Sequence, residues 1–519
     1  MTFSFSALSC IYIFALVLAA KAFLSPVKRK DRRFPRPPGP KPLPVIGNLL
    51  DVPTDMPWLG YDEWFRKYGD IVSIEVLGQP IVLLGSLKRT SDLFDKRSSI
   101  YSDRVRMPMI NELMGWDFSL AFMPYGHQWR RHRRMFNSHF NITASARYKP
   151  IHLQETQFLL GRLLESPDDF LHHVRHTFSA TIMNSVYGIV IQESNDPYIS
   201  TAEECLQGLA EAGVAGSFLV DLLPVLKYVP SWVPGAGFQR KATSWKMLNK
   251  QLVDKPFNAV KERLGQGKAK DCAVVKMLET VASDHQGLDE ERTARNCAAV
   301  AYAGGADTTV SSAQTFFLAM ALYPEVQKQA QAEIDAVVGN QRLPDFSDRD
   351  SLPYINAIVK ETMRWQNVTP LSVAHATTED DVYDGYFIPK GSIVIGSTWS
   401  IMHDPEAYPE PHEFRPERFL KDGKLNSDIR DPHVAAFGFG RRLCPGRWFS
   451  DNSLFTVVSC VTAVYDITRK ADADGNVLPL EPGMTSGLLS YPVPFECTIK
   501  PRSKAAEALV RESQGVNET

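Results

Sequence analysis

The residue of this chain best suited to chemistry is Cys444, which lies in a loop rich in glycine and arginine. The segment Phe437–Gly446 reads FGFGRRLCPG, and an apolar run, 454–464, follows it. This pattern is typical of a tight loop that enters a helix. Because backbone N–H groups at a helix N-terminus and nearby guanidinium groups favour a deprotonated thiol, we expect Cys444 to be a thiolate. The alternative, a small buried apolar cysteine, does not explain the surrounding glycines and arginines.

A second group of reactive side chains lies within a long helical pattern that runs from about 289 to 323. The segment Gly304–Thr309 reads GGADTT. Adjacent glycines inside a helix cost roughly 1 kcal/mol each relative to alanine, so they need a structural reason, and a local opening of the helix is one such reason. Two packing glycines and a surface acid are the alternative that this motif alone leaves open.

Two further pairs of residues are spaced so that both members of each pair would share one face of a helix. Glu361 and Arg364 are three residues apart and can form an ion pair on one helix face. Trp129 and Arg133 are four residues apart and also share a face. Each pair is weak evidence for function by itself, because such spacings are common in helices.

The elements that position these groups are predicted to be mainly α-helical, with small β-sheets. Short β-rich runs on either side of Gly78 predict an early hairpin, and Pro324 both ends the long helix and opens another, to about 338. The predicted strands are 71–77, 81–84, 386–388, 393–395 and 495–499.

The N-terminal segment predicts a membrane anchor, residues 1–25, because it is almost uncharged over nearly the ~20 residues that a spanning helix needs. Basic residues follow it, which predicts a cytosolic body on that side. A cleaved signal peptide is the alternative, but its basic residues would precede the apolar run. Residues 26–48 form a basic and proline-rich hinge, expected to be a stiff spacer, and 49–519 read as one domain.

Composition limits the partners of this body. The net charge is −2, so no excess of either sign indicates a nucleic-acid partner. Seven cysteines without a C-x-x-C pair argue against a disulfide framework or a structural zinc site. A reducing compartment fits this pattern.

Together these residues resemble the cytochrome P450 superfamily. Phe437, Gly440, Arg442, Cys444 and Gly446 occupy every specified position of the family's haem-binding pattern F-x-x-G-x-R-x-C-x-G. The resemblance implies the cytochrome P450 fold, with Cys444 as the axial thiolate ligand of the iron of haem b. It also implies that Arg442 pairs with a haem propionate.

The other motifs follow in the order that the family requires, and the resemblance implies a role for each. Asp307 and Thr308 would be the catalytic acid–alcohol pair that relays protons to bound oxygen. Trp129 and Arg133 would donate to the haem propionates, as would His375, although Ala374 stands where the family usually has proline. The structural triad would be Glu361, Arg364 and Arg418.

The resemblance further implies a membrane-bound monooxygenase of the microsomal fungal type. The segment Asn111–Trp116 resembles basidiomycete enzymes of secondary metabolism, which suggests a small hydrophobic substrate of terpenoid, indole or polyketide type. Too few residues follow Cys444 for fused flavin domains, so NADPH electrons would come from a separate NADPH–cytochrome P450 reductase, with cytochrome b5 as a second candidate donor. Exposed arginines at 130, 131 and 134 could face that partner.

The implied location is the endoplasmic reticulum membrane, with a single pass and a cytosolic catalytic domain. The sequons at Asn141, Asn367 and Asn517 would then stay unmodified. Two alternatives remain: a haem-thiolate isomerase or dehydratase that needs no O2, and a non-catalytic haem sensor. The segments expected to contact substrate are 107–122, 214–233, 303–309, 368–374 and 486–489.

Overall fold

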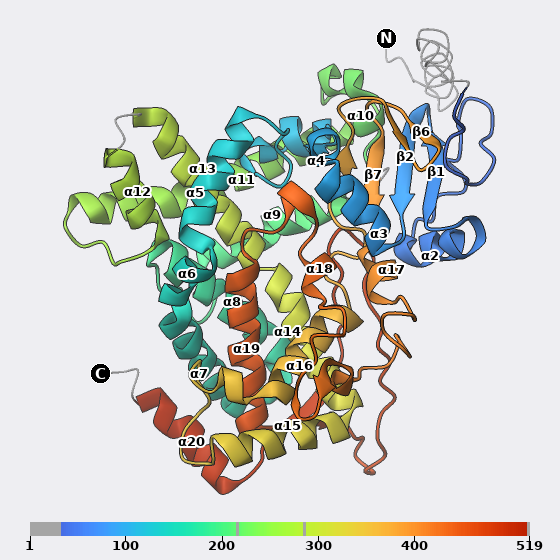
Figure 1. The fold of residues 1–519 in the computed structure, drawn as a ribbon. Coiled ribbons are helices and arrows are strands. Elements are labelled where there is room, and N and C mark those ends of the chain that lie inside the picture. Colours follow the sequence, from blue (N-terminus) through green and yellow to red (C-terminus); the bar gives the residue numbers. More distant parts are fainter. Residues whose placement is uncertain (1–32, 214–216, 284–286, 516–519) are drawn as a thin grey trace.

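The computed structural model describes residues 33–213, 217–283 and 287–515. Figure 1 shows a large helical part beside a small sheet region, which the first strands and a later segment build together. The predicted membrane anchor, 1–25, and the start of the hinge lie outside the described residues. Within the described ranges, no helix is both long and apolar enough to span a bilayer.

The main sheet has five strands in the order β1-β2-β7-β4-β3. The predicted hairpin around Gly78 is confirmed: β1 and β2 pair antiparallel from Ile71↔Leu84 to Val76↔Gln79. The later strand β7 pairs with β2 in parallel, so the sheet is complete only when residues about 300 positions apart in the sequence come together. The strands are β1 (Ile71–Val76), β2 (Gln79–Leu84), β3 (Asp103–Arg104), β4 (His375–Ala376), β5 (Asp381–Tyr383), β6 (Tyr386–Ile388), β7 (Ile393–Gly396), β8 (Leu420–Lys421), β9 (Lys424–Leu425), β10 (Tyr465–Arg469) and β11 (Cys497–Pro501).

Helices form most of the rest, as the sequence predicts. The α-helices of the described ranges are α2 (Pro57–Tyr68), α3 (Leu87–Thr90), α4 (Ser98–Tyr101), α5 (His127–Phe140), α6 (Ile142–Ser145), α7 (Lys149–Glu165), α8 (Phe170–Tyr187), α9 (Pro197–Gly213), α10 (Leu219–Leu222), α11 (Gly237–Gly265), α12 (Ala273–Ser283), α13 (Gly287–Gly305), α14 (Thr308–Leu322), α15 (Pro324–Val337), α16 (Pro353–Trp365), α17 (Thr398–Met402), α18 (His433–Ala436), α19 (Arg447–Val464) and α20 (Lys504–Gly515).

The long helix predicted over 289–323 is two helices in the structure. Helix α13 ends at Gly305, and α14 begins at Thr308 with Asp307 outside helical geometry. A local opening, one of the two explanations for the adjacent glycines, is therefore present. It falls between two hydrophobic clusters, one around α13 and one around α14, which hold the two halves separately.

Two helices, α14 and α19, pack in the interior and are surrounded by other elements (Figure 1). Nearly all side chains of α14 are buried, and α19 is buried along most of its length. A helix that is apolar on all sides is stable only in the core. This packing fixes the start of α14 and the start of α19, where the reactive residues lie.

The described part of the proline-rich hinge lies against the sheet instead of standing free of it. The Ser73 N–H donates to the Pro38 carbonyl at 2.8 Å, and Arg36 pairs with Glu75 at 2.8 Å. A Cβ at Gly39 would lie 2.1 Å from the Ser73 carbonyl oxygen, so only glycine allows this approach. Residues 33–48 are thus held by β1.

Candidate functional site

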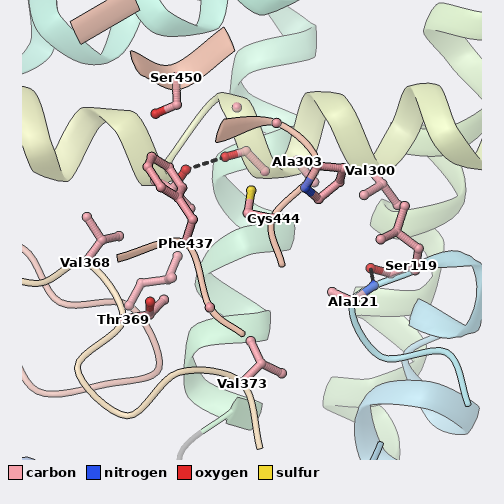
Figure 2. Close-up of a pocket in the computed structure, with 18 of the residues that line it drawn as sticks. Ser119, Ala121, Val300, Ala303, Val368, Thr369, Val373, Phe437, Cys444 and Ser450 are labelled. Carbon is pink, nitrogen blue, oxygen red and sulfur yellow. Dashed lines mark hydrogen bonds between the residues drawn. The ribbon is translucent and has the colours of Figure 1, made fainter. Parts of the chain in front are cut away.

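A cavity of about 340 Å³ lies among α13, α14, the segment after α16 and the loop before α19. Figure 2 shows the Cys444 sulfur at this cavity, with Val300 and Ala303 from α13 and with Val368 and Thr369 from the segment after α16. The described residues of the wall include both Cys444 and Thr308. The sequence motifs that are far apart along the chain therefore meet at one cavity.

The loop that carries Cys444 is held by backbone contacts. The Cys444 N–H donates to the Phe437 carbonyl at 2.8 Å. Gly440 has φ +54°, and a Cβ there would lie 2.1 Å from the Phe94 carbonyl oxygen. Glycine at 440 is therefore needed for close packing of the loop on Phe94, because a side chain would collide with backbone.

Burial and nearby charge act in opposite directions on the Cys444 thiol. Burial raises the pKa of this thiol, and that effect exceeds the lowering by the Gly446 N–H group and by the charges of Arg133 and Arg447. The helix N-terminus and the arginines alone therefore do not produce a thiolate. A metal ion bound to the sulfur would, because coordination deprotonates a thiol outright.

Three guanidinium groups line the same cavity, one on a buried residue and two on partly buried residues, and each donates to backbone carbonyls. Arg442 donates to the carbonyls of Ser102, Leu120 and Met123 at 2.8–3.1 Å. Arg104 donates to three more carbonyl groups at 2.5–3.0 Å, and Arg133 donates to one at 2.6 Å.

These three groups form no ion pair with a carboxylate of the described residues. Burial lowers the pKa of all three, that of Arg442 to about 10 and that of Arg104 well below its ordinary value. Cations in this state favour an anionic ligand with several oxygens. Arg104 was missed from the sequence, because no local motif marks it.

The other two residues expected to bind propionates are placed differently. His375 lies at the cavity with Nδ1 hydrogen-bonded to the Tyr101 carbonyl at 2.7 Å. Burial, followed by the charge of Arg104, lowers the pKa of His375 well below its ordinary value. The Trp129 indole N–H donates to the Leu120 carbonyl at 3.1 Å, and the Arg442 guanidinium lies 4.6 Å above its ring. Trp129 thus also supports Arg442.

The structure places Thr308 on the cavity wall and Asp307 behind it. The Thr308 hydroxyl donates to the Gly304 carbonyl at 2.7 Å, across the gap between α13 and α14. Gly304 itself borders open space, whereas a Cβ at Gly305 would lie 2.8 Å from Ile182 Cδ1. The two glycines therefore have different roles: one leaves room in the cavity and one allows α8 to pack closely.

Asp307 is held by two partners that sequence reasoning missed. Arg175 of α8 donates to one carboxylate oxygen at 2.8 Å, and the Tyr491 hydroxyl donates to the other. Glu203 of α9 lies 3.8 Å from Arg175 and is about half exposed. The buried acid is thereby connected through Arg175 to a carboxylate at the surface.

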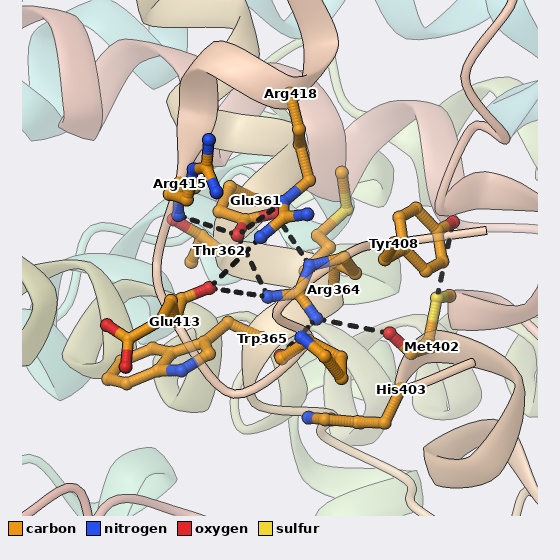
Figure 3. Close-up of polar contacts among 12 residues, drawn as sticks. Glu361, Thr362, Arg364, Trp365, Met402, His403, Tyr408, Glu413, Arg415 and Arg418 are labelled. Atoms are coloured by element: carbon orange, nitrogen blue, oxygen red, sulfur yellow. Dashed lines mark hydrogen bonds and ion pairs between the residues drawn. The ribbon is translucent and has the colours of Figure 1, made fainter. Parts of the chain in front are cut away.

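The predicted triad of Glu361, Arg364 and Arg418 is assembled (Figure 3). Arg364 forms two hydrogen bonds with Glu361, at 2.7 and 2.8 Å, and Arg418 forms a third at 3.1 Å. The side chains of Glu361 and Arg364 are both 0% exposed. Their remaining donors bind carbonyls of the segment 402–413, so the triad fixes that segment to α16.

A second charged network lies next to the Cys444 loop. His433, on α18 directly before that loop, forms a hydrogen bond with Asp431 at 2.8 Å and lies 3.6 Å from an oxygen of Asp451 on α19. Burial alone would lower the pKa of His433, but the hydrogen bond to Asp431 and the charge of Asp451 raise it to about 9. A charged His433 thus links α18 to α19.

Most of the expected substrate segments reach the cavity, and one does not. Parts of four expected segments contribute to the wall: residues 116 and 119–122, 303–305 and 308–309, 368–369 and 372–373, and 488–489. None of the described residues in 217–233 does. Leu206, Leu209 and Ala210 of α9, the helix before that segment, line the cavity instead.

The arginines next to Trp129 divide between two roles. Arg130 and Arg134 are exposed, as expected for a docking surface. Arg131 is mostly buried in ion pairs with Glu290 and Asp289, so it ties α5 to α13. Of the sequons, Asn367 is buried with its amide bonded to the end of α16, and Asn517 lies outside the described residues.

A cysteine sulfur and uncompensated arginines around one apolar cavity define a haem-thiolate type of site. The model of the family described as "Cytochrome P450" matches residues 37–494. The chain is 44% identical to Cytochrome P450 monooxygenase COX2 of Coprinopsis cinerea over 97% of this chain and 96% of that one. It is 41% identical to Tryptamine 4-monooxygenase of Psilocybe cyanescens, over 95% and 98% respectively. The chain belongs to the cytochrome P450 family, whose similar members here are basidiomycete monooxygenases.

The residues present fit the haem that this family implies. The Cys444 sulfur is free of any disulfide and faces the cavity. No carboxylate of the described residues pairs with Arg104, Arg133 or Arg442. The two propionates of haem would supply carboxylate partners for these guanidinium groups. The wall around the sulfur is otherwise largely apolar, as a flat hydrophobic macrocycle requires.

Proposed function

We propose that this enzyme is a membrane-bound haem-thiolate monooxygenase that inserts one oxygen atom from O2 into a small hydrophobic substrate of fungal secondary metabolism. Haem b would be bound through Cys444, and NADPH electrons would come from a separate NADPH–cytochrome P450 reductase, with cytochrome b5 as a second candidate donor. The observation that carries this proposal is the Cys444 sulfur in the same apolar wall as Thr308 and three arginines without counter-ions.

The chain's own residues supply binding, orientation and protons. Arg104, Arg133 and Arg442 would hold the propionates, and the tight loop at Gly440 would place Cys444. Bound haem would supply the centre at which O2 is activated. The apolar wall excludes water from that centre, which limits loss of reducing equivalents to solvent.

Proton supply is assigned to Thr308 and Asp307. Thr308 Oγ1 lies on the wall and can pass a proton into the cavity, but it is 2.7 Å from the Gly304 carbonyl, its present acceptor. Asp307 does not line the cavity and is bonded to Arg175 and Tyr491. For the relay to work, the Asp307 carboxylate must exchange one of these partners for Thr308 or for a water molecule.

The relay is tested with Thr308→Ala, and Thr308→Ser serves as the matched control because it keeps the hydroxyl group. We expect the alanine variant to divert NADPH electrons into hydrogen peroxide while the serine variant stays coupled. The measurement is the ratio of product to NADPH consumed with reductase. Equal coupling in Thr308→Ala and the unmodified enzyme would refute the proton role of this hydroxyl group.

The two alternative functions are discriminated in the same assay. An isomerase or dehydratase would convert its substrate without O2 or reductase, and a sensor would bind ligand without turnover. Thr308 on the wall of the same cavity as Cys444 supports the monooxygenase over both. Substrate-dependent uptake of O2 would show that the enzyme is a monooxygenase and neither an isomerase or dehydratase nor a sensor.

Membrane attachment at the endoplasmic reticulum with a cytosolic body is proposed from the apolar first 25 residues and the basic residues after them. The exposed Arg130 and Arg134 support docking of an acidic reductase. Removal of residues 1–25 should release the protein from microsomes. A glycosidase-sensitive mass shift at Asn141, whose side chain is only partly buried, would reverse the proposed orientation.

A further inference from the structure

The described residues of the cavity wall carry guanidinium groups and apolar surface but no carboxylate. Among the described residues that line it, none is an aspartate or a glutamate. The charged side chains on the wall are the three guanidinium groups of Arg104, Arg133 and Arg442, and these face two propionates once haem is bound. The two propionates of haem would therefore not outnumber the three guanidinium groups on the wall.

The part of the wall built by α9, α13 and the segment before β11 is apolar. It consists of Leu206, Leu209, Ala210, Val300, Leu488 and Leu489. These aliphatic groups cannot replace the water molecules around an ion. An ammonium group placed against them would lose its hydration without gaining a partner.

Two acidic residues are sequence neighbours of wall residues, and both already have hydrogen-bond partners. Asp307, beside Thr308, has both carboxylate oxygens bonded, one to Arg175 and one to Tyr491. Asp103, beside Arg104, accepts two backbone N–H groups at 2.7 and 2.9 Å. Neither lines the cavity.

Aromatic rings could replace only part of the hydration that a cation would lose in this cavity. The face of Trp129 is covered by the Arg442 guanidinium at 4.6 Å. Trp116 stacks on Phe118, with ring centroids 5.2 Å apart, and meets Phe122 edge to face. A cation–π contact in a protein is much weaker than the hydration that an ammonium ion gives up.

We propose that the substrate of this enzyme is uncharged, and that molecules carrying an ammonium group are excluded because the described residues of the cavity wall offer them no carboxylate. This inference rests on the proposed monooxygenase function and narrows its substrate class. Among small hydrophobic molecules it selects neutral hydrocarbons, alcohols and ketones, and it rejects alkylamines of equal size and shape.

The test compares two probes of the same shape with the full-length, haem-loaded protein. One is the quaternary ion 2-(indol-3-yl)ethyltrimethylammonium, which cannot lose a proton and has no lone pair for iron. The other is its carbon isostere, 3-(3,3-dimethylbutyl)indole. Binding is followed by the Soret shift and, independently, by the rise in melting temperature.

We expect the neutral probe to bind at least about a hundredfold more tightly than the ion, a difference of about 2.8 kcal/mol. Equal affinities would overturn the inference, as would failure of the neutral probe to bind. Loss of the proposed function itself would be seen separately, because a protein without the Cys444–iron bond lacks the absorption band of its reduced CO complex near 450 nm.

A variant pair tests the physical reason for exclusion. Thr369 lines the cavity, and its hydroxyl has no hydrogen-bond partner among the described residues. Thr369→Asp adds a carboxylate, and Thr369→Asn adds a neutral group of the same size. We expect the aspartate variant to bind the quaternary ion at least about tenfold more tightly than the asparagine variant does. Equal binding by two variants with normal CO spectra would show that shape, not charge, excludes the ion.

Discussion

Glu361→Gln should destabilise the fold far more than loss of an ordinary surface acid. The Glu361 carboxylate accepts hydrogen bonds from two nitrogens of Arg364, from Arg418 and from the Arg415 backbone. A glutamine keeps the shape but turns an NH2 group toward these donors and leaves the Arg364 guanidinium, 0% exposed, without a counter-charge. Removing one partner of a buried pair costs about 3–5 kcal/mol, a large share of the roughly 5–15 kcal/mol that stabilises a typical protein.

The matched control is Glu410→Gln, in the same segment. Glu410 pairs with Arg415, and its side chain is 64% exposed, so we expect a loss of less than about 1 kcal/mol. Unfolding in guanidinium chloride, followed by tryptophan fluorescence, measures both variants, and the absorbance of the reduced CO complex measures the fraction that holds haem. A Glu361→Gln protein within about 1 kcal/mol of the Glu410→Gln protein would refute the structural role assigned to the triad.

Gly305→Ala should lower the free energy of unfolding by about 1–3 kcal/mol, because its Cβ would lie 2.8 Å from Ile182 Cδ1. Gly304 borders open space, so Gly304→Ala should lower it less. Thermal unfolding of both variants measures the difference, and equal losses would contradict the packing argument. The second prediction concerns pH. The pKa of His433 rises from 6.5 in the unfolded chain to about 9 in the folded protein, so its stabilisation is complete below pH about 6.5 and disappears as the pH rises through about 9. The free energy of unfolding relative to His433→Gln should therefore fall by about 3 kcal/mol between pH 6 and pH 9.5, and a constant difference over that range would count against the charged imidazole.

The parts of the site that could be predicted from sequence are those set by local spacing. The loop around Cys444 follows from glycines and arginines within ten residues, and the gap before Thr308 follows from two adjacent glycines. The Glu361–Arg364 pair follows from helical geometry, and its third member followed from the family resemblance.

The parts that could not be predicted depend on contacts between distant segments. Arg104 joins the other cations only because β3 pairs with β4, and no pattern around it indicates a ligand. Arg175 and Tyr491 reach Asp307 from positions more than 100 residues away on either side. The effect of burial on the pKa of the Cys444 thiol could not be predicted, because charge is visible in a sequence and burial is not.

The most direct test of the central claim is the absorption spectrum of the reduced protein under CO. We predict a band at about 450 nm for the unmodified chain and its loss in Cys444→Ala, because only an iron–thiolate bond produces it. Cys460→Ala, which removes a buried cysteine of α19, is the control that should keep the band. A Cys444→Ala protein that retains the band would contradict the assignment of Cys444 as the iron ligand.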